Sequence, residues 1–382
     1  MYLGLMEAER RQKALLPMHL ETFTLVQSRE VMLMRHQVLE FLQSEIDQNH
    51  IPGAVIHVSH QGETLLQEAV GFRAVNPAKE QMKLDTVFDM ASLTKVVATL
   101  PIVLKLMEAG VWHFNDKVAH FLPEFAQNGK SEITIKHLLT HTSGLAAHYE
   151  YFRENLTTLQ ILERIYQEQP VAAIGEKVIY SDLGFITLYK LIEAVTQEQF
   201  EVYVKRELFD KLDMKETGFR PQFERERYAA TEYSAKLNDY KHGIVHDENT
   251  ESMGGISGHA GLFSTIHDLA NYASMIENEG VYRGNRILSE SSLKIARRNY
   301  SPSSQELRGL GWILKGSNFS SCGDLFSETS YGHTGFTGTS IWFDPETRLH
   351  VILLTNRVHF GRKDHILRLR PRLHNIIRSY FQ

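Results

Sequence analysis

A serine and a lysine separated by two residues form the first pattern in the sequence that could do chemistry. They are Ser92 and Lys95, in the segment Ala-Ser-Leu-Thr-Lys. On a helix, side chains at i and i+3 share one face with Cβ atoms about 5–6 Å apart, so the lysine amine can reach the serine hydroxyl. A lysine accepts the serine proton only if burial or nearby positive charge lowers a pKa that starts at about 10.4. We predict that Ser92 is a nucleophile and Lys95 its base; taken alone, the pair is also typical of a surface serine and a solvated lysine.

A second group, Tyr180-Ser181-Asp182, lies at the start of a helix-like segment. A tyrosine placed near Lys95 can relay a proton between the nucleophile and a leaving group. On their own, Tyr180 is equally typical of a core aromatic residue and Asp182 of a helix N-cap.

A third group is the glycine-rich segment from Tyr331 to Gly338, which contains His333, Thr334, Gly335 and Phe336. Glycines on or beside a strand mark the close approach of a ligand or of another backbone. The amide N–H of Phe336, paired with that of Ser92, could form an oxyanion hole. A glycine-rich loop with a structural histidine is the alternative.

The order of these groups, SLTK, then YSD, then HTG, resembles the serine β-lactamase and penicillin-binding-protein superfamily over roughly residues 30–380. The phrase LLTHTSGL at 138–145 is similar to the class C β-lactamase branch, which also holds esterases, D-amino-acid peptidases and cell-wall amidases. The phrases VHDEN at 245–249 and GGISGHAGLFS at 254–264 are similar to a narrower group of bacterial homologues within this branch. These include an N-acetylmuramoyl-L-alanine amidase of muropeptide recycling and a penicillin-binding carboxypeptidase.

The resemblance implies a role for each matching residue. Ser92 corresponds to the nucleophile, Lys95 to its base and Tyr180 to the second general base. It implies an oxyanion hole from Ser92 and Phe336, and substrate contacts by Asp182, His333, Thr334 and Gly335. No cofactor is expected, because acyl transfer to a serine needs none.

Two positions depart from the family pattern. His333 stands where β-lactamases have a lysine, and a histidine with an ordinary pKa of about 6.5 is mostly neutral at pH 7, which weakens recognition of a β-lactam carboxylate. We therefore expect activity to depend on pH around 6–7 through His333. Asp182 replaces the usual asparagine, so it repels an anionic group and attracts a cationic one.

Histidines elsewhere raise the question of a metal site. His137 and His141 are one helical turn apart, but no glutamate follows His137 as H-E-x-x-H requires, so packing or capping roles are favoured. His246, His259 and His267 are interpreted in the same way, and no metal is predicted. His246, with Asp247, is expected to border the substrate cleft instead.

Strand patterns lie towards both ends of the chain and helical patterns lie between them. We predict an α+β fold of the β-lactamase/transpeptidase type, an antiparallel sheet flanked by helices with an inserted all-helical lobe. Residues 1–30 are an N-terminal extension, and 31–112 with 291–382 form the sheet lobe. Residues 113–290 form the mostly helical lobe, with a long loop lining the cleft.

Composition narrows the range of partners. A formal net charge of −5, with no block of Lys and Arg, disfavours nucleic acid. Val96 to Leu104 is far shorter than the roughly 20 apolar residues of a membrane span, and no secretory signal is recognised, so a cytoplasmic location is expected. The single cysteine, Cys322, excludes an internal disulfide. The oligomeric state is left open.

Together these patterns predict a serine hydrolase that forms an acyl-enzyme on Ser92. The expected substrate is a small molecule or muropeptide, cleaved at an ester or at an amide of the peptidoglycan-derived type. The alternatives are a true β-lactamase, a D,D-carboxypeptidase, and a penicillin-binding or sensor protein that is acylated without turnover.

Overall fold

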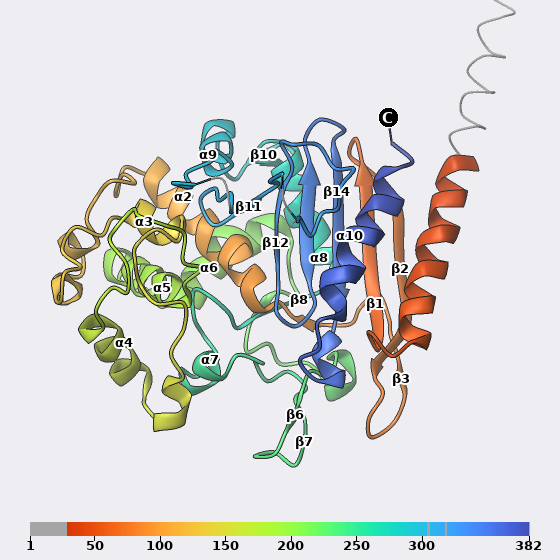
Figure 1. Cartoon of the computed structure of the whole chain (residues 1–382), viewed down its shortest axis with the longest axis horizontal. Coiled ribbons are helices and arrows are strands. Elements are labelled where there is room, and N and C mark those ends of the chain that lie inside the picture. Colours follow the sequence, from red (N-terminus) through yellow and green to blue (C-terminus); the bar gives the residue numbers. More distant parts are fainter. Residues whose placement is uncertain (1–28, 304–305, 318, 382) are drawn as a thin grey trace, which may run out of the picture.

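A seven-stranded antiparallel sheet brings the early and late parts of the chain together (Figure 1). The computed structural model describes residues 29–303, 306–317 and 319–381, so most of the expected N-terminal extension lies outside the described residues. The strand order is β11-β12-β13-β14-β1-β2-β3. The strands are β1 (Gly53–His60), β2 (Glu63–Ala74), β3 (Glu80–Gln81), β11 (Ile313–Leu314), β12 (Tyr331–Thr334), β13 (Ser340–Asp344) and β14 (Leu349–Thr355). β1 and β2 pair as an antiparallel hairpin around Gln61-Gly62.

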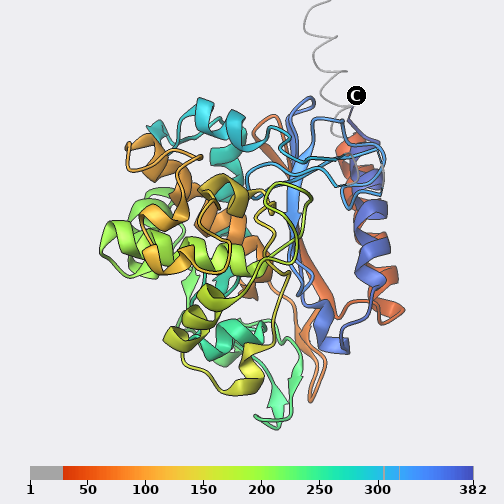
Figure 2. The ribbon, with the colours of Figure 1, turned by 60° about the vertical axis from the view of Figure 1, so that its left-hand side comes forward.

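Alternation along the central strands explains why both faces of this sheet are covered. In β1, Ala54, Ile56 and Val58 enter one apolar cluster, whereas Val55 enters the other. The first cluster is closed by the helix at residues 29–47 and by α10 (His365–Arg378). The second is closed by α8 (Ile266–Glu277) and the helical part of the chain. Figure 2 shows these helices on opposite sides of the sheet, and β1 is accordingly buried along almost its whole length, with successive side chains entering different clusters.

The middle of the chain is mainly helical and carries only short strands. In addition to α8, the helices of this region are α2 (Leu100–Glu108), α3 (Ile135–Leu139), α4 (Thr158–Gln167), α5 (Asp182–Thr196), α6 (Phe200–Val204) and α7 (Glu248–Ser252). Helix α9 (Glu290–Ala296) comes directly after it. Short 3₁₀ turns lie at Ala91–Leu93, Val118–His120, Pro123–Ala126, Tyr151–Glu154, Asp210–Leu212, Arg225–Arg227 and Arg357–Phe360, and a π-helical segment at Lys205–Phe209 follows α6. The short strands are β4 (Phe88–Asp89), β5 (Gly218–Phe219) and β8 (Leu262–Ser264) in one sheet, β6 (Tyr233–Ser234) with β7 (Asp239–Tyr240), and β9 (Val281–Tyr282) with β10 (Asn285–Arg286).

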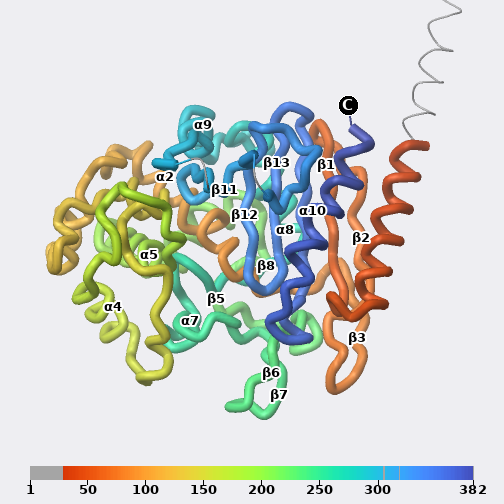
Figure 3. The backbone as a smooth tube through the Cα atoms, in the orientation of Figure 1, coloured from red at the N-terminus to blue at the C-terminus, as the bar shows by residue number. Residues whose placement is uncertain are grey.

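This architecture confirms the predicted α+β class, with strands from both chain ends in one sheet (Figure 3). The division into lobes at 31–112, 113–290 and 291–382 stays a prediction. Along the described ranges, no helix has the length and apolar character needed to cross a bilayer.

The segment that carries Ser92 is not the single helix that its apolar run suggests. A 3₁₀ turn at Ala91–Leu93 leads into a π-helical segment at Lys95–Thr99, and α2 begins at Leu100. Pro101 therefore falls where the π-helical segment passes directly into α2. The carbonyl of Val96, five residues earlier, accepts a hydrogen bond of 2.6 Å from the Tyr272 hydroxyl in place of the backbone N–H that a proline lacks.

Candidate active site

The turn before Ser92 is held by a buried carboxylate. Asp89, the last residue of β4, accepts a hydrogen bond of 2.8 Å from the N–H of Ala91 and one of 2.6 Å from the N–H of His246. Ala91 has a φ of 44°, in the left-handed region that alanine rarely adopts, and the Asp89 bond offsets that strain. The first backbone bond of the turn is from Leu93 N–H to Met90 O, so the N–H of Ser92 stays at the open start of the helix.

Lys95 lies beneath Ser92 and is fully buried. Its Nζ is 3.1 Å from Ser92 Oγ, 2.8 Å from Asp182 Oδ1 and 3.2 Å from the carbonyl oxygen of His259. An ammonium has three N–H groups, and these three acceptors satisfy them all. The predicted proximity of Lys95 to Ser92 is therefore present.

The charge on Lys95 differs from the expectation. Burial by itself lowers the pKa of Lys95, but the Asp182 carboxylate and Tyr180 outweigh it, so the pKa is raised above the usual value. Partial burial by itself raises the pKa of Asp182, but Lys95 outweighs this effect and holds the pKa well below the usual range. In the resting site Lys95 is an ammonium and Asp182 a carboxylate. The expected lowering of the Lys95 pKa is wrong because the sequence did not show that a carboxylate would lie 2.8 Å away.

Tyr180 lies where several groups converge on its ring. The Nζ of Lys95 is 4.8 Å from the ring centroid and the guanidinium carbon of Arg308 is 5.1 Å from it. The rings of His141 and His333 lie at centroid distances of 4.6 and 6.0 Å. Tyr180 is therefore fixed beside Lys95, with two cations and two imidazoles around its phenol.

Both of these imidazoles are neutral. Burial, followed by the charges of Arg308 and Lys95, lowers the pKa of His141 and of His333 well below the usual value. His141 Nδ1 accepts the N–H of Ser181 at 3.0 Å, whereas His333 Nδ1 donates to the carbonyl of Thr334 at 2.9 Å. Because His333 does not titrate near neutrality, the expected dependence of activity on its protonation around pH 6–7 is wrong.

The end of β12 approaches the turn before Ser92 closely. A Cβ added to Gly335 would lie 2.1 Å from Thr339 Oγ1 and 2.6 Å from the carbonyl oxygen of Met90, so only glycine fits. Thr337 Oγ1 and Thr339 Oγ1 donate to the carbonyls of Asp89 and Met90 at 2.8 and 3.2 Å. At Gly335, the backbone after β12 therefore packs directly against the backbone of the turn before Ser92. Thr334 ends β12, opposite Ser340.

A cavity of about 230 Å³ opens above these groups. Its lining residues include Ser92, Tyr180, Asp182, His246 and Phe336 from the predicted set. Of the remaining predicted residues, Lys95, His333 and Gly335 are buried or packed behind the wall of this cavity. No backbone bond to another described residue uses the N–H of Phe336, which leaves it available with that of Ser92 for a developing oxyanion.

His246 joins the cavity to the loop region at 230–250. Its N–H donates to Asp89, its Nε2 is 3.0 Å from Glu232 Oε2, and its ring is 5.6 Å from that of Phe336. It borders the cavity, as expected.

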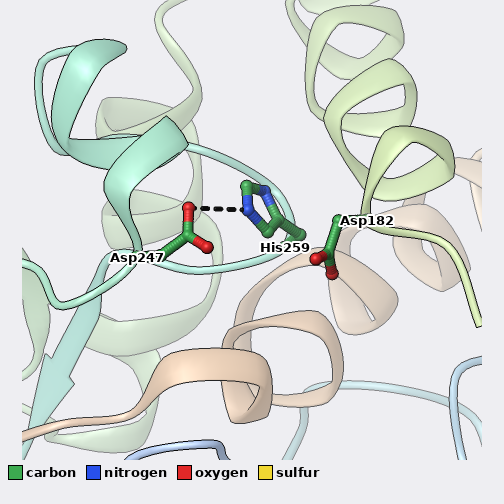
Figure 4. Close-up of side chains that lie close together, drawn as sticks. All are labelled: Asp182, Asp247 and His259. Atoms are coloured by element: carbon green, nitrogen blue, oxygen red, sulfur yellow. Dashed lines mark hydrogen bonds and ion pairs between the residues drawn. The ribbon is translucent and has the colours of Figure 1, made fainter. Parts of the chain in front are cut away.

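One cluster of acidic groups and a histidine has the composition of a metal site (Figure 4). One ligand atom from each of Asp182, Asp247 and His259 lies within 4.8 Å of the others. However, Lys95 already donates to Asp182, and His259 Nε2 is 3.0 Å from Asp247 Oδ1. The Lys95 ammonium supplies the positive charge that a cation would bring, so this donor set is interpreted as an ion-pair network rather than a metal site.

Sequence reasoning missed three groups at the site. Asp89 carries no motif, although its place just before SLTK is a positional signal. His148 Nδ1 is 3.6 Å from Asp182 Oδ2, and this interaction raises the His148 pKa above its usual value. Arg308 contacts the Tyr180 ring from a segment without regular structure, and it hydrogen-bonds Glu306.

Comparison with known proteins agrees with this geometry. The family model described as Beta-lactamase matches residues 38–375. The chain is 32% identical over 348 residues to a protein named N-acetylmuramyl-L-alanine amidase from Bacillus subtilis, covering 81% of this chain and 78% of that protein. It is 33% identical over 310 residues to a putative D-alanyl-D-alanine carboxypeptidase from Escherichia coli, covering 72% and 70% of the two chains.

Among solved structures, the fold resembles that of EstCE1, a hydrolase with promiscuous acyltransferase activity. The TM-score is 0.75 at 20% sequence identity, and the match covers 92% of this chain and all of that one. Because the sequence identity is 20%, this similarity is evidence for the fold alone.

Proposed function

The chain belongs to the beta-lactamase family and is a serine hydrolase, and from this we propose that it cleaves an ester or a muropeptide-type amide through an acyl-enzyme on Ser92. The observation that carries the proposal is the 3.1 Å contact between Lys95 Nζ and Ser92 Oγ at the base of a cavity that Tyr180 and Phe336 also line. The similarity to an N-acetylmuramyl-L-alanine amidase favours the amide.

In this mechanism Ser92 Oγ attacks the substrate carbonyl carbon, and the N–H groups of Ser92 and Phe336 bind the oxygen that becomes negative. Lys95 is charged at rest, and only its neutral form can accept the serine proton. Asp182 keeps the population of that neutral form small. Tyr180, beside Lys95, is placed to pass a proton to the leaving group. Water then attacks the carbonyl carbon of the ester on Ser92, and its proton returns to Ser92 Oγ through Lys95 and Tyr180 as the acid product leaves.

The wall around the cavity supports a substrate other than a β-lactam. The neutral His333 supplies no positive charge, and Arg308 has its charge compensated by Glu306. Asp182 and Asp247 line the cavity and stay ionised, so an anionic group next to the scissile bond is disfavoured. Similarity to a putative carboxypeptidase, 33% identical, makes hydrolysis of a peptide that ends in D-alanyl-D-alanine the second candidate, although its terminal carboxylate would lie next to the scissile bond. The cytoplasmic location inferred from the sequence remains a proposal.

The test combines intact-mass measurement with rates on a p-nitrophenyl ester, a chromogenic cephalosporin, a D-alanyl-D-alanine peptide and an N-acetylmuramoyl peptide. Ser92→Ala is expected to lose covalent labelling and about 10⁴-fold or more in kcat/KM. Ser131→Ala, at an exposed serine, serves as the matched control. Full activity in Ser92→Ala contradicts the proposal, and stable acylation without turnover of every substrate identifies a sensor instead.

A further inference from the structure

A second and larger cavity adjoins the one at Ser92. It has a volume of about 620 Å³, and its walls share His246, Glu248 and Arg362 with the cavity of about 230 Å³. The smaller cavity has room for the groups on either side of a scissile bond, but not for a longer peptide or glycopeptide. We call the larger one the distal groove. A substrate that extends beyond the reacting carbonyl would pass His246 and enter it.

We propose that the distal groove binds a peptide arm of the substrate that ends in a carboxylate, with Lys236 as its counter-charge. This inference rests on the proposed function, because it assumes that the scissile bond lies at Ser92.

The groove has fixed walls. Arg362 donates to Glu232 Oε2 from Nε at 2.9 Å and from Nη2 at 2.8 Å, and it also donates to Glu248. Glu232 directly precedes β6, and Glu248 is the first residue of α7. One guanidinium therefore links the β6–β7 hairpin to the helix on the other side of the groove, where Arg geometry suits two carboxylates.

Lys236 differs from the other charged groups in these walls because it has no ion-pair partner in the part of the chain that the structure describes. Glu232 and Glu248 are paired with Arg362, and Glu251 is paired with Lys241 at 2.6 Å. Among the described residues that line the groove, Lys236 is the one charged side chain without an ion-pair partner, and it is exposed. A ligand carboxylate can bind Lys236 without displacing an existing ion pair, whereas a ligand cation would compete with Arg362 or Lys241 for their carboxylate partners.

The groove also offers apolar contact. Tyr233 on β6 is 49% exposed, and its hydroxyl donates to Asn238 at 2.7 Å, which fixes the direction of the ring. Phe152 lines the groove from the 3₁₀ turn at Tyr151–Glu154. Aromatic faces next to polar groups suit a peptide, whose side chains are partly apolar and whose backbone is polar.

The experiment measures binding in the Ser92→Ala background, so it does not depend on turnover. Two N-acetylmuramoyl tripeptides are compared by calorimetry, one with a free C-terminal carboxylate and one with a carboxamide. We expect the acid to bind about 5-fold more tightly at low salt, and Lys236→Glu to abolish or reverse this preference. Lys83→Glu makes the same charge change at an exposed lysine that lines neither cavity and should keep the preference.

A second variant tests the apolar contact. Tyr233→Ala is expected to weaken both peptides by about 3- to 10-fold while the preference for the acid persists. The proposal is overturned if neither peptide binds, if the acid is not preferred, or if the preference survives Lys236→Glu or is lost in Lys83→Glu. These outcomes are independent of Ser92 acylation, so the groove can fail while the proposed function stands, and the reverse.

Discussion

Ion pairs occur in two walls of the site, and they differ in how strongly they affect the protonation of their partners. The inner wall contains Lys95 and Asp182, whose side chains are 0% and 19% exposed. The outer wall contains Arg362 and Glu248, at 47% and 31%. Burial makes the inner pair strongly coupled, so each partner decides the protonation of the other. Solvent screens the outer pair, which therefore orients groups and has little effect on their charge. The two ion pairs can thus be altered separately.

The largest effect is expected from breaking the inner pair. Lys95→Met leaves the Asp182 carboxylate buried without its partner, which should destabilise the fold by about 3–5 kcal/mol and lower kcat/KM by about 10²–10⁴-fold or more. Denaturant unfolding and initial rates measure the two effects. In the double variant Lys95→Met/Asp182→Asn, most of the stability should return and the activity should not. A double variant as unstable as the single one would contradict this account of the pair.

The next effect concerns the approach of β12 to the inner wall. Gly335→Ala places a methyl group 2.1 Å from Thr339 Oγ1, so the turn must shift, and we expect about 1–3 kcal/mol of destabilisation with a marked loss of kcat. Gly218→Ala is the matched control, since a Cβ there meets nothing within 4 Å. Equal behaviour of the two variants in thermal unfolding and rate measurements would refute the steric argument.

The pH–rate profile sharpens the assignment of the base. The Asp182 carboxylate favours the charged form of Lys95, so Asp182→Asn should lower the Lys95 pKa and produce the neutral amine at lower pH. The rising basic limb of kcat/KM should therefore move to lower pH in the variant. A limb that does not move would show that Lys95 is not the base.

The two histidines nearest Tyr180 and Asp182 should titrate differently. His148, paired with Asp182, should titrate above its ordinary value of about 6.5, and Asp182→Asn should lower its midpoint. Buried His333 should remain neutral through this range. Histidine NMR titration measures both. A His333 midpoint between pH 6 and 7 would restore the expectation from the sequence.

The smallest effect is expected in the outer wall. Arg362→Gln should change the free energy of unfolding by less than about 1 kcal/mol, because the pair is exposed, and added salt should reduce the difference further. Denaturant unfolding at low and high salt checks this. A salt-independent loss of several kcal/mol would mean that this pair behaves like the inner one.

The sequence predicted the fold class and the residues that meet at the cavity, because each lies in a motif with a fixed local geometry. Spacing placed Ser92 near Lys95, and order along the chain matched Tyr180 and Phe336 to the family. It did not predict charge states. These depend on contacts between residues far apart in the chain, such as Lys95 with Asp182, which no local pattern encodes. Asp89 was missed for the same reason, since its partner His246 is distant in sequence.

The pairing of β1 with β14 also sets when the catalytic apparatus can exist. Ala54 lies opposite Thr355, and Thr337 and Thr339 reach back to the turn before Ser92. During synthesis, the segment with Ser92 therefore emerges from the ribosome long before β12 and Phe336, whose N–H we propose for the oxyanion hole. Contacts of such high sequence separation fold slowly and late. A nascent chain that stops short of β14 should carry Ser92 yet remain chemically inert.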